Sequence, residues 1–164
     1  MRTIRRLVQS GVVVICAGGG GVPVVVDASG TVRGVEAVID KDRSAALLAA
    51  LLDADALLLL TDVPAVVSDW GSAFARPLRH VTPDELRMLS FEAHSMGPKV
   101  AAAARFVERT GKRAVIGALS DATRLLAGEA GTQITLTHHP DRWYPPSEWD
   151  TDLLPASWKG PSEQ

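Results

Sequence analysis

Residues 42–62 read DRSAALLAALLDADALLLLTD, and this stretch predicts a helix followed directly by a strand. Asp42 opens the helix, and apolar residues follow it at helical spacing as far as Leu52. Residues 57–60 are four leucines without polar alternation, which is typical of a strand that is covered on both faces. This unit predicts a helix that packs on a sheet.

Two other apolar runs share this strand pattern, and helices are predicted between them. Residues 11–17 (GVVVICA) are rich in β-branched side chains, and residues 114–116 (AVI) form a shorter run. A helix is predicted over residues 98–110, where Gly111 stops it. Strands that alternate with helices predict an α/β fold, here a three-layer sandwich with a mainly parallel central sheet.

Shorter elements are predicted around this framework. Residues 82–85 (TPDE) form a capping box with proline at the first helical position. Residues 27–30 (DASG) form a turn between two valine-rich runs, which predicts a hairpin. Residues 35–39 (VEAVI) are predicted as a further strand, and Ser120-Asp121 is predicted to cap a short helix. Cys16, inside the first valine run, is predicted to be an inert core residue.

The composition is that of a globular protein, and it excludes several classes of function. The 164 residues are 46% hydrophobic and 22% charged, enough for one domain or one lobe of a larger fold. The net charge of −2 leaves no basic excess with which to bind nucleic acid or anionic lipid. The single cysteine excludes an internal disulfide framework and a cysteine-rich metal site.

The N-terminal residues do not have the pattern of a targeting signal. They are basic, but the apolar stretch that follows is short and breaks at Gly18. Apolar runs elsewhere stay below the roughly 18 residues of a membrane span. The sequence therefore predicts a cytoplasmic protein.

The composition changes near the end of the chain. Residues 138–164 hold five of the ten prolines and three of the four tryptophans, but no valine, isoleucine or phenylalanine. Prolines at this density break helices and remove backbone donors. We therefore expect a folded body over residues 1–137 and an irregular tail that Trp143, Trp149 or Trp158 holds on the body.

Polar residues follow three predicted strands, at the carboxyl ends where α/β sheets bind ligands. They are Gly18-Gly19-Gly20-Gly21, Asp40-Lys41-Asp42 and Thr61-Asp62. The four glycines allow backbone amides to surround an anion such as phosphate, although a flexible turn has the same pattern. They match neither a Walker loop nor the dinucleotide-binding fingerprint.

The segment Asp40-Lys41-Asp42 is a candidate site for phosphoryl chemistry. Asp42 is predicted as the N-cap of the following helix, with Lys41 directed into the cleft. A lysine held by two carboxylates is a fixed cation, which suits the charge that develops on a transferring phosphoryl group. A helix cap with a solvated lysine is the alternative interpretation.

Lys99 is a second candidate, since it lies in the first turn of a predicted helix. A cation at this position opposes the helix macrodipole, so its presence indicates a task such as binding nucleotide phosphates. A surface lysine without a function is the alternative.

Thr61-Asp62-Val63 also has two interpretations. It would either line a nucleotide pocket or simply end the preceding strand. His138-His139 has no third ligand at useful spacing, so no metal site is predicted there.

Taken in order, these segments resemble the C-terminal half of the carbamate kinases, a branch of the amino acid kinase family. The similarity extends over about residues 4–135 and is carried by five stretches. They are residues 12–23, 34–42 (GVEAVIDKD), 60–63 (LTDV), 95–100 (SMGPKV) and 128–135. The second and fourth of these, as a pair, favour the functional interpretations over the alternatives. The family's N-terminal half and its usual ending have no counterpart in this sequence.

The resemblance implies a role for each candidate residue. Gly18-Gly19-Gly20-Gly21 and Asp40 would hold the carbamate or the phosphoryl group that is moved. Lys41 would neutralise the transition state, Asp42 would orient the lysines, and Lys99 would contact the nucleotide phosphates. The residues that would border the nucleotide are Thr61, Asp62, Val63, Met96 and Gly97.

The resemblance also implies a reaction, cofactors and partners. The family transfers a phosphoryl group between carbamoyl phosphate and ADP with Mg²⁺, which yields ATP and carbamate, commonly in arginine catabolism. The expected partners are an adenine nucleotide and a carbamate-type substrate, with a homodimer in the full-length form and without nucleic acid or membrane. Two alternatives stay open: a non-catalytic nucleotide-binding remnant, and another amino acid kinase.

Overall fold

The computed structural model describes residues 1–149 with the exception of 73, 93 and 94. The helices are α1 (Arg2–Gln9), α2 (Lys41–Leu52), α3 (Pro83–Arg87), α4 (Met96–Thr110) and α5 (Ala122–Ala127), with short 3₁₀ turns η1 (Leu119–Asp121) and η2 (Pro146–Glu148). The strands are β1 (Val24–Val26), β2 (Val32–Gly34), β3 (Ala56–Thr61), β4 (Val67–Ser68), β5 (Arg76–Pro77), β6 (His80–Val81), β7 (Arg113–Ala118) and β8 (Thr132–Ile134).

Four strands form the central sheet, in the order β3-β7-β8-β6. β3 pairs in parallel with β7 and β6 in parallel with β8, whereas β7 and β8 are antiparallel. β3 and β7 coincide with the apolar runs at 57–60 and 114–116, so these two predicted strands are confirmed. The predicted α/β fold with a mainly parallel sheet is confirmed as well.

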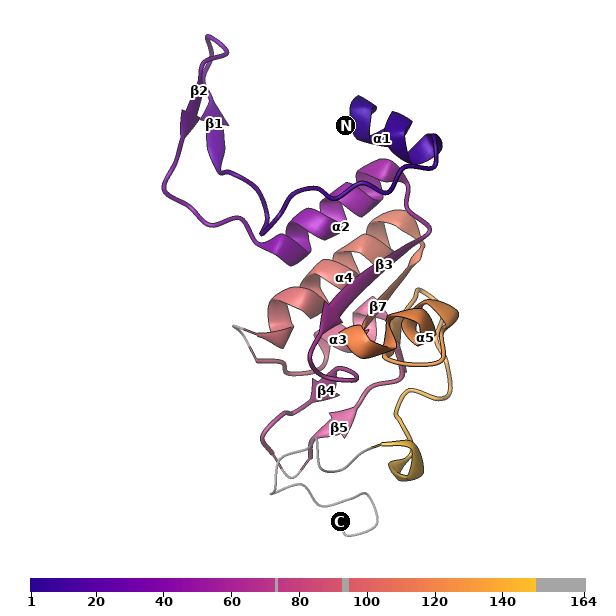
Figure 1. Cartoon of the computed structure of the whole chain (residues 1–164). Helices are drawn as coiled ribbons and strands as arrows, with labels where there is room; N and C mark the ends of the chain where they lie inside the picture. The colour runs from indigo at the N-terminus through magenta and orange to yellow at the C-terminus, as the bar shows by residue number, and fades with distance from the viewer. Residues whose placement is uncertain (73, 93–94, 150–164) are drawn as a thin grey trace.

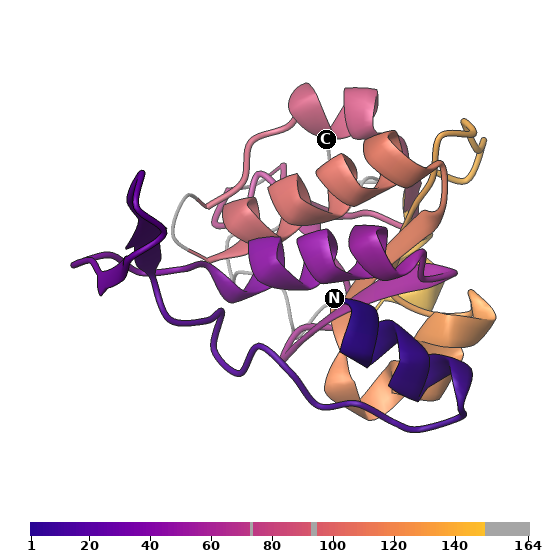
Figure 2. The same ribbon diagram turned by 90° about the horizontal axis from the view of Figure 1, so that it is seen from above.

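Helices cover both faces of this sheet. α2 and α4 lie side by side on one face and α5 lies on the other (Figures 1 and 2). Side chains alternate between the two faces of a strand. Leu57 and Leu59 therefore join the main core beneath α2 and α4, whereas Leu58 and Val115 pack with Leu125 of α5. This alternation produces the three layers that the sequence predicts.

The predicted ends of two helices are confirmed. Thr82 and Glu85 form the reciprocal capping box at the start of α3, since each side chain accepts a hydrogen bond from the other's amide. α4 ends at Gly111, whose φ of +70° is the left-handed conformation that glycine adopts readily. Asp121 precedes α5 as predicted, but its side chain makes no capping hydrogen bond there.

The N-cap predicted for α2 is wrong. Asp40, and not Asp42, caps the helix, because Asp40 Oδ1 accepts a hydrogen bond of 2.7 Å from the Arg43 amide. An N-cap side chain reaches the amide two or three residues ahead, and Asp40 has the extended backbone that this requires. Asp42 is thereby placed inside the first turn and is free to make a different contact.

Two predicted strands do not form. Residues 11–17 and 35–39 are irregular, and Val13 and Ile15 are 91% and 97% exposed. A strand is stable only when a neighbour accepts and donates its backbone hydrogen bonds, and neither segment has a paired strand within the described part of the chain. Cys16 is exposed for the same reason, so its assignment to the core is also wrong.

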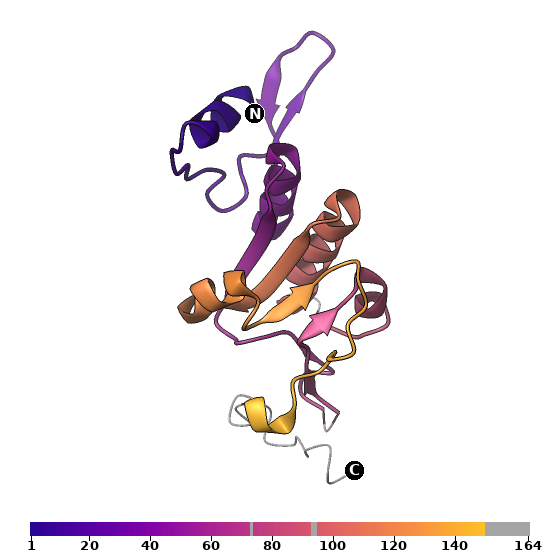
Figure 3. The same ribbon diagram turned by 90° about the vertical axis from the view of Figure 1, so that its right-hand side faces the viewer.

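The hairpin predicted around residues 27–30 is confirmed. β1 and β2 pair in antiparallel register, and the hairpin extends away from the central sheet (Figure 3). The Asp27 carboxylate accepts hydrogen bonds from the amides of Ser29 and Thr31, at 2.9 and 3.0 Å. This Asx-type turn explains why the local sequence is sufficient to form the hairpin.

The described part of the predicted tail, residues 138–149, packs against the body. Trp143 forms a bridge with Leu78 and contacts the main core. Trp149 is buried in a second cluster with Ala65, Val67 and Ala75. The rest of the tail, including Trp158, lies outside the described residues. Within the residues that the structure describes, no helix combines the length and the apolar content needed to cross a membrane.

His80 of β6 gives the stability a predictable pH dependence. Its ring stacks on His139 at a centroid distance of 4.2 Å. Burial lowers the pKa of His80, the positive charges of His139 and Arg79 lower it further, and Asp141 opposes them. The folded protein therefore binds fewer protons at His80 than the unfolded chain, so stability is lost as the pH falls below about 6.5, the ordinary pKa of histidine.

We expect the melting temperature to fall more steeply between about pH 7.5 and pH 5.5 in the unsubstituted chain than in His80→Gln. Thermal unfolding followed by circular dichroism at a series of pH values measures both slopes. Equal slopes in the two proteins would show that His80 does not contribute to the pH dependence.

Candidate functional site

The first turns of α2 and α4 and the carboxyl end of β3 meet at one edge of the molecule (Figure 1). Lys41 and Asp42 lie in the first turn of α2, and Lys99 lies in the first turn of α4. Residues that are 57 positions apart in sequence are therefore brought to the same place.

Asp42 contacts both lysines. Lys99 Nζ donates to Asp42 Oδ1 and Oδ2, at 3.1 Å in each case, and Lys41 Nζ lies 3.7 Å from Oδ2. Asp42 and Lys99 are only 7% and 9% exposed, whereas Lys41 is exposed to solvent. We call these residues the Lys41–Asp42–Lys99 cluster.

The cluster explains the unusual position of Lys99. An ammonium group near a helix N-terminus is unfavourable, and a buried one without a counter-charge is more so. Asp42 supplies that counter-charge from the first turn of α2, where an acid is favourable. With two ammonium groups and one carboxylate, the cluster keeps one positive charge in excess, and the exposed Lys41 presents it to an anion.

The glycine loop lies against the start of α2. Gly20 is buried, and Ser44 Oγ of α2 donates a hydrogen bond of 2.8 Å to its carbonyl oxygen. Gly20 has a φ of +137°, and a Cβ atom there would lie 2.2 Å from the Ile39 carbonyl oxygen. Gly18, Gly19 and Gly21 are exposed, with open space around them. Gly20 thus holds the loop next to Asp40-Lys41-Asp42.

We expect Gly20→Ala to detach the loop from α2, because the added Cβ meets backbone that cannot move aside. The strained backbone and the clash together cost about 1–3 kcal/mol. Limited proteolysis is expected to cut residues 17–23 faster in Gly20→Ala than in the unsubstituted chain. Gly19→Ala is the matched control, since Gly19 has open space and no left-handed φ. Equal cleavage rates in both variants would contradict this account of Gly20.

A cavity of about 190 Å³ opens beside the end of β3. It is lined by four of the predicted nucleotide-binding residues and by others that the sequence did not indicate. The predicted ones are Thr61, Asp62, Val63 and Met96, and the additional ones are Ala65, Val67, Trp70, Glu92 and Ser95. Thr61 Oγ1 donates to Asp62 Oδ1 at 3.0 Å, which orients the polar wall of the cavity.

The cavity differs from the sequence expectation at two points. Gly97 does not line it; its amide donates to the Glu92 carbonyl at 2.8 Å, and a Cβ would meet that oxygen at 3.0 Å. Trp70 contributes a half-exposed indole that no motif indicated. The signal that could have revealed it is a large aromatic residue next to glycine in a loop just after a strand, where ligand contacts concentrate.

The arrangement can bind an anion and a flat ring at the same time. The lysine cluster and two helix N-termini favour a phosphate group, and the cavity next to α4 offers apolar and aromatic contacts. Among the described residues, no group of three or more histidine, cysteine, aspartate or glutamate side chains is arranged to hold a metal ion.

Comparison with known proteins places this chain in a family. The family model described as "Amino acid kinase family" matches residues 1–118. Carbamate kinase from Haemophilus influenzae is 48% identical over 135 residues, which cover 82% of this chain and 44% of that protein. Carbamate kinase from Escherichia coli strain K12 is 53% identical over 133 residues, which cover 81% and 43%. The chain thus spans less than half the length of these curated relatives.

Solved structures agree with the sequence relatives. Carbamate kinase from Giardia lamblia bound to AMP-PNP matches with a TM-score of 0.79 and 39% identity, covering 83% of this chain and 49% of that one. N-acetylglutamate synthase from Neisseria gonorrhoeae, at 19% identity and a TM-score of 0.61, shares the fold alone. The chain therefore belongs to the amino acid kinase family, and carbamate kinases are its relatives over about four fifths of its length.

Proposed function

We propose that this chain forms the nucleotide-binding part of a carbamate kinase, which transfers the phosphoryl group of carbamoyl phosphate to ADP. The observation that carries the proposal is the buried Asp42 carboxylate, which holds Lys99 at 3.1 Å and Lys41 at 3.7 Å beside the glycine loop. Its relatives of about 50% identity support the same reaction class, and the Giardia lamblia relative was solved with AMP-PNP bound.

In this reaction an oxygen of the ADP β-phosphate attacks the phosphorus of carbamoyl phosphate, and the bond from phosphorus to the carbamate oxygen breaks. The products are ATP and carbamate, and carbamate decays to ammonia and carbon dioxide. Lys41, exposed at the cluster, would neutralise charge on the transferring group, and Lys99 would contact the nucleotide phosphates. The buried Asp42 would keep the two ammonium groups apart at a fixed spacing.

The remaining candidates complete the proposed site. Gly18, Gly19, Gly20 and Gly21 would present backbone amides to the phosphoryl group or the carbamate. Asp40 would act indirectly, since its side chain is engaged in capping α2. Thr61, Asp62, Val63 and Met96 would border the nucleotide, with Trp70 as an aromatic contact. Gly97 would act by shaping the loop before α4.

Mg²⁺ fits this site as a companion of the nucleotide. It usually takes most of its ligands from phosphates and water, with one or two carboxylates from the protein. Asp62, exposed at the cavity wall, is the carboxylate that would be in reach of bound phosphates. When bound, the ion would neutralise phosphate charge.

The wider biological assignment belongs to this proposal and rests on the carbamate kinase resemblance. It comprises a role in arginine catabolism, a cytoplasmic location and a homodimer of the full-length form. The relatives are more than twice as long as the matched region, so the complete reaction is proposed for this chain together with the part that the relatives carry in addition.

A non-catalytic nucleotide-binding protein is the second candidate. The observation that favours it is the exposure of the apolar residues between 12 and 39, which a complete enzyme would cover. Another amino acid kinase is the third. Lys41 between two aspartates argues for carbamate over the other branches of the family.

Isothermal titration of this chain with ADP and Mg²⁺ tests nucleotide binding. A coupled assay for ATP formation from carbamoyl phosphate, in a chimera that joins the chain to the unmatched part of the Escherichia coli carbamate kinase, separates the first two candidates. Binding with turnover supports the kinase, and binding without turnover supports the nucleotide-binding protein. If ADP does not bind to the folded chain, the proposed nucleotide site is wrong.

A further inference from the structure

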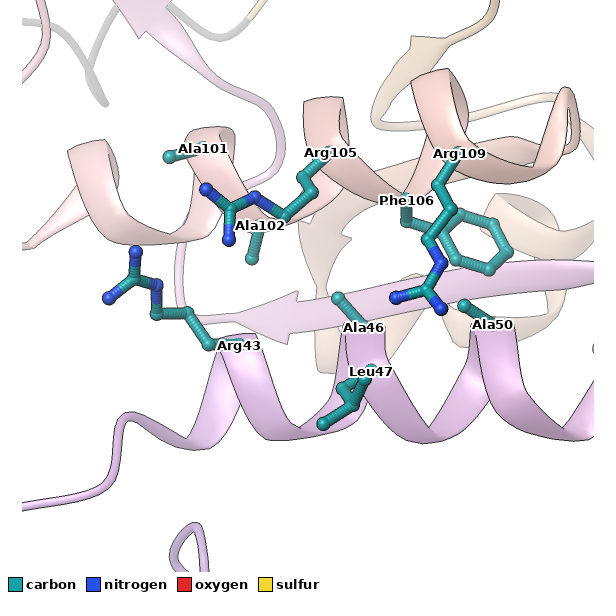
Figure 4. A pocket seen from close by; sticks show the side chains of 9 residues that line it. All are labelled: Arg43, Ala46, Leu47, Ala50, Ala101, Ala102, Arg105, Phe106 and Arg109. Atoms are coloured by element: carbon teal, nitrogen blue, oxygen red, sulfur yellow. The ribbon is translucent and has the colours of Figure 1, made fainter.

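The seam between α2 and α4 carries a groove of about 240 Å³ on its solvent side (Figure 4). Its floor is apolar and consists of small residues and one aromatic ring: Ala46, Ala50, Ala102 and Phe106. Ala46, Ala102 and Phe106 are buried, and the half-exposed side chain of Leu47 forms an apolar side wall of the groove. Alanines at the floor leave room for another backbone to approach closely.

Three arginines line the rim of this groove from both helices. Arg43 extends from α2, and Arg105 and Arg109 extend from α4 over the floor (Figure 4). No aspartate or glutamate lines the groove among the described residues. Glu108 of α4, which precedes Arg109 in the sequence, pairs with Arg87 of α3. The groove therefore combines an apolar floor with three arginines for which no ion pair is found among the described residues.

The other arginines of this region behave differently. Between residues 40 and 149, the remaining ones each contact an acid, a carbonyl oxygen or an aromatic ring: Arg76, Arg79, Arg87, Arg113, Arg124 and Arg142. For Arg43, Arg105 and Arg109, no hydrogen bond or ion pair of the side chain is found with a described residue. Within residues 40–149, the arginines without a described side-chain partner therefore all line this groove.

We propose that this groove binds an acidic amphipathic helix of a partner protein. A helix presents apolar side chains three and four residues apart on one face. Such a face suits the apolar floor of the groove between α2 and α4. Arg105 and Arg109 are four residues apart, so their stems are spaced by about 6 Å along α4. Glutamates at the same spacing on a bound helix would meet both, while Arg43 would engage an acid on the opposite side.

The size of the groove limits the strength of the interaction. From Arg43 to Ala50 it follows α2 for about two helical turns, or roughly 10 Å. A contact of this length is at the low end of specific interfaces, so a dissociation constant of about 10–100 μM is expected. The charges make the binding weaker at high salt, because exposed ion pairs are screened.

The test uses the full chain and a fluorescent, stapled helical peptide as the probe. The peptide carries leucines three and four residues apart on one face and glutamates along both flanks. Fluorescence anisotropy is expected to show saturable binding, and Arg105→Glu with Arg109→Glu is expected to weaken it by about tenfold or more. Arg124→Glu is the matched control, since Arg124 is an exposed arginine of α5 already paired with Asp121. It is expected to leave the affinity unchanged.

Two control probes test the chemistry of the partner. A peptide with serines in place of the leucines, and a single-stranded RNA oligonucleotide, share the negative charge but lack the apolar face. Both are expected to bind at least about tenfold more weakly. Equal binding of either would overturn the proposal in favour of simple attraction of polyanions. Absence of peptide binding, or an equal effect of Arg124→Glu and the two groove substitutions, would also overturn it.

This proposal is independent of the kinase assignment. The groove lies on residues that do not belong to the Lys41–Asp42–Lys99 cluster or to the cavity beside β3. Peptide binding is therefore expected to be the same with and without saturating ADP, and in Lys41→Ala. Loss of peptide binding in Lys41→Ala would show that the peptide occupies the phosphate site and would overturn the assignment to the groove.

Discussion

Lys99→Ala is expected to lower the free energy of unfolding by about 3–5 kcal/mol and to abolish measurable nucleotide binding. The substitution removes the bidentate partner of Asp42 and leaves a carboxylate that is 7% exposed without a buried counter-charge. The exposed Lys41, at 3.7 Å, is a weaker replacement because solvent screens it. Chemical denaturation followed by circular dichroism measures the stability, and titration calorimetry with ADP measures the binding.

Lys112→Ala is the matched control for this experiment. Lys112 forms its ion pair with Asp53 near the far end of α2, where the aspartate is exposed, so a loss below about 1 kcal/mol is expected. The double variant Asp42→Leu with Lys99→Met separates stability from binding. It is expected to regain most of the stability, because an apolar pair replaces the buried ion pair, but not the nucleotide binding. If Lys99→Ala and Lys112→Ala are equally stable, the Asp42–Lys99 pair does not stabilise the fold.

Lys41→Ala is expected to lower kcat strongly and to have little effect on stability. Lys41 is exposed, so its removal creates no cavity and no buried charge. In the proposed mechanism its ammonium group stabilises charge that develops only in the transition state. Removing one such group costs about 10²–10³ in kcat, with a small change in KM.

The measurement uses a chimera that joins the unmatched part of the Escherichia coli carbamate kinase to this chain, assayed for ATP formation from carbamoyl phosphate. Lys112→Ala in the same chimera controls for the loss of one surface lysine. Unchanged turnover in Lys41→Ala would remove the basis for the carbamate assignment, whereas the stability of the Asp42–Lys99 pair would be unaffected.

Local sequence signals predicted much of the core fold. The leucine run became β3, the Ala-Val-Ile run became part of β7, and Gly111 ended α4. Each of these depends on periodicity, burial or a cap within a few residues of chain. The same kind of reasoning failed for residues 11–17, because a β-branched run forms a strand only if another strand is available to pair with it.

The candidate site was predictable as a set of residues but not as a geometry. The resemblance to the carbamate kinases suggested that Lys41 and Lys99 share a function, yet the local sequence pattern assigned the helix cap to Asp42. In the structure Asp40 takes the cap and Asp42 holds Lys99. A shift of two residues in the start of α2 thus changes the role of Asp42 from a local capping group to a buried counter-charge.

The sequence by itself determined the α/β class, the strands β3 and β7, the start of α3, the C-terminal end of α4, and the family to which the chain belongs. Each of these features depends on short stretches of sequence, in which neighbouring residues determine the backbone conformation or form a recognisable motif. The tertiary structure alone decided that Asp42 and Lys99, 57 residues apart, form a buried ion pair, that Trp70 lines the cavity, and that three arginines share one groove. These features depend on the packing of α2 against α4 and of both helices on β3, and such long-range contacts leave no periodic signal in the sequence.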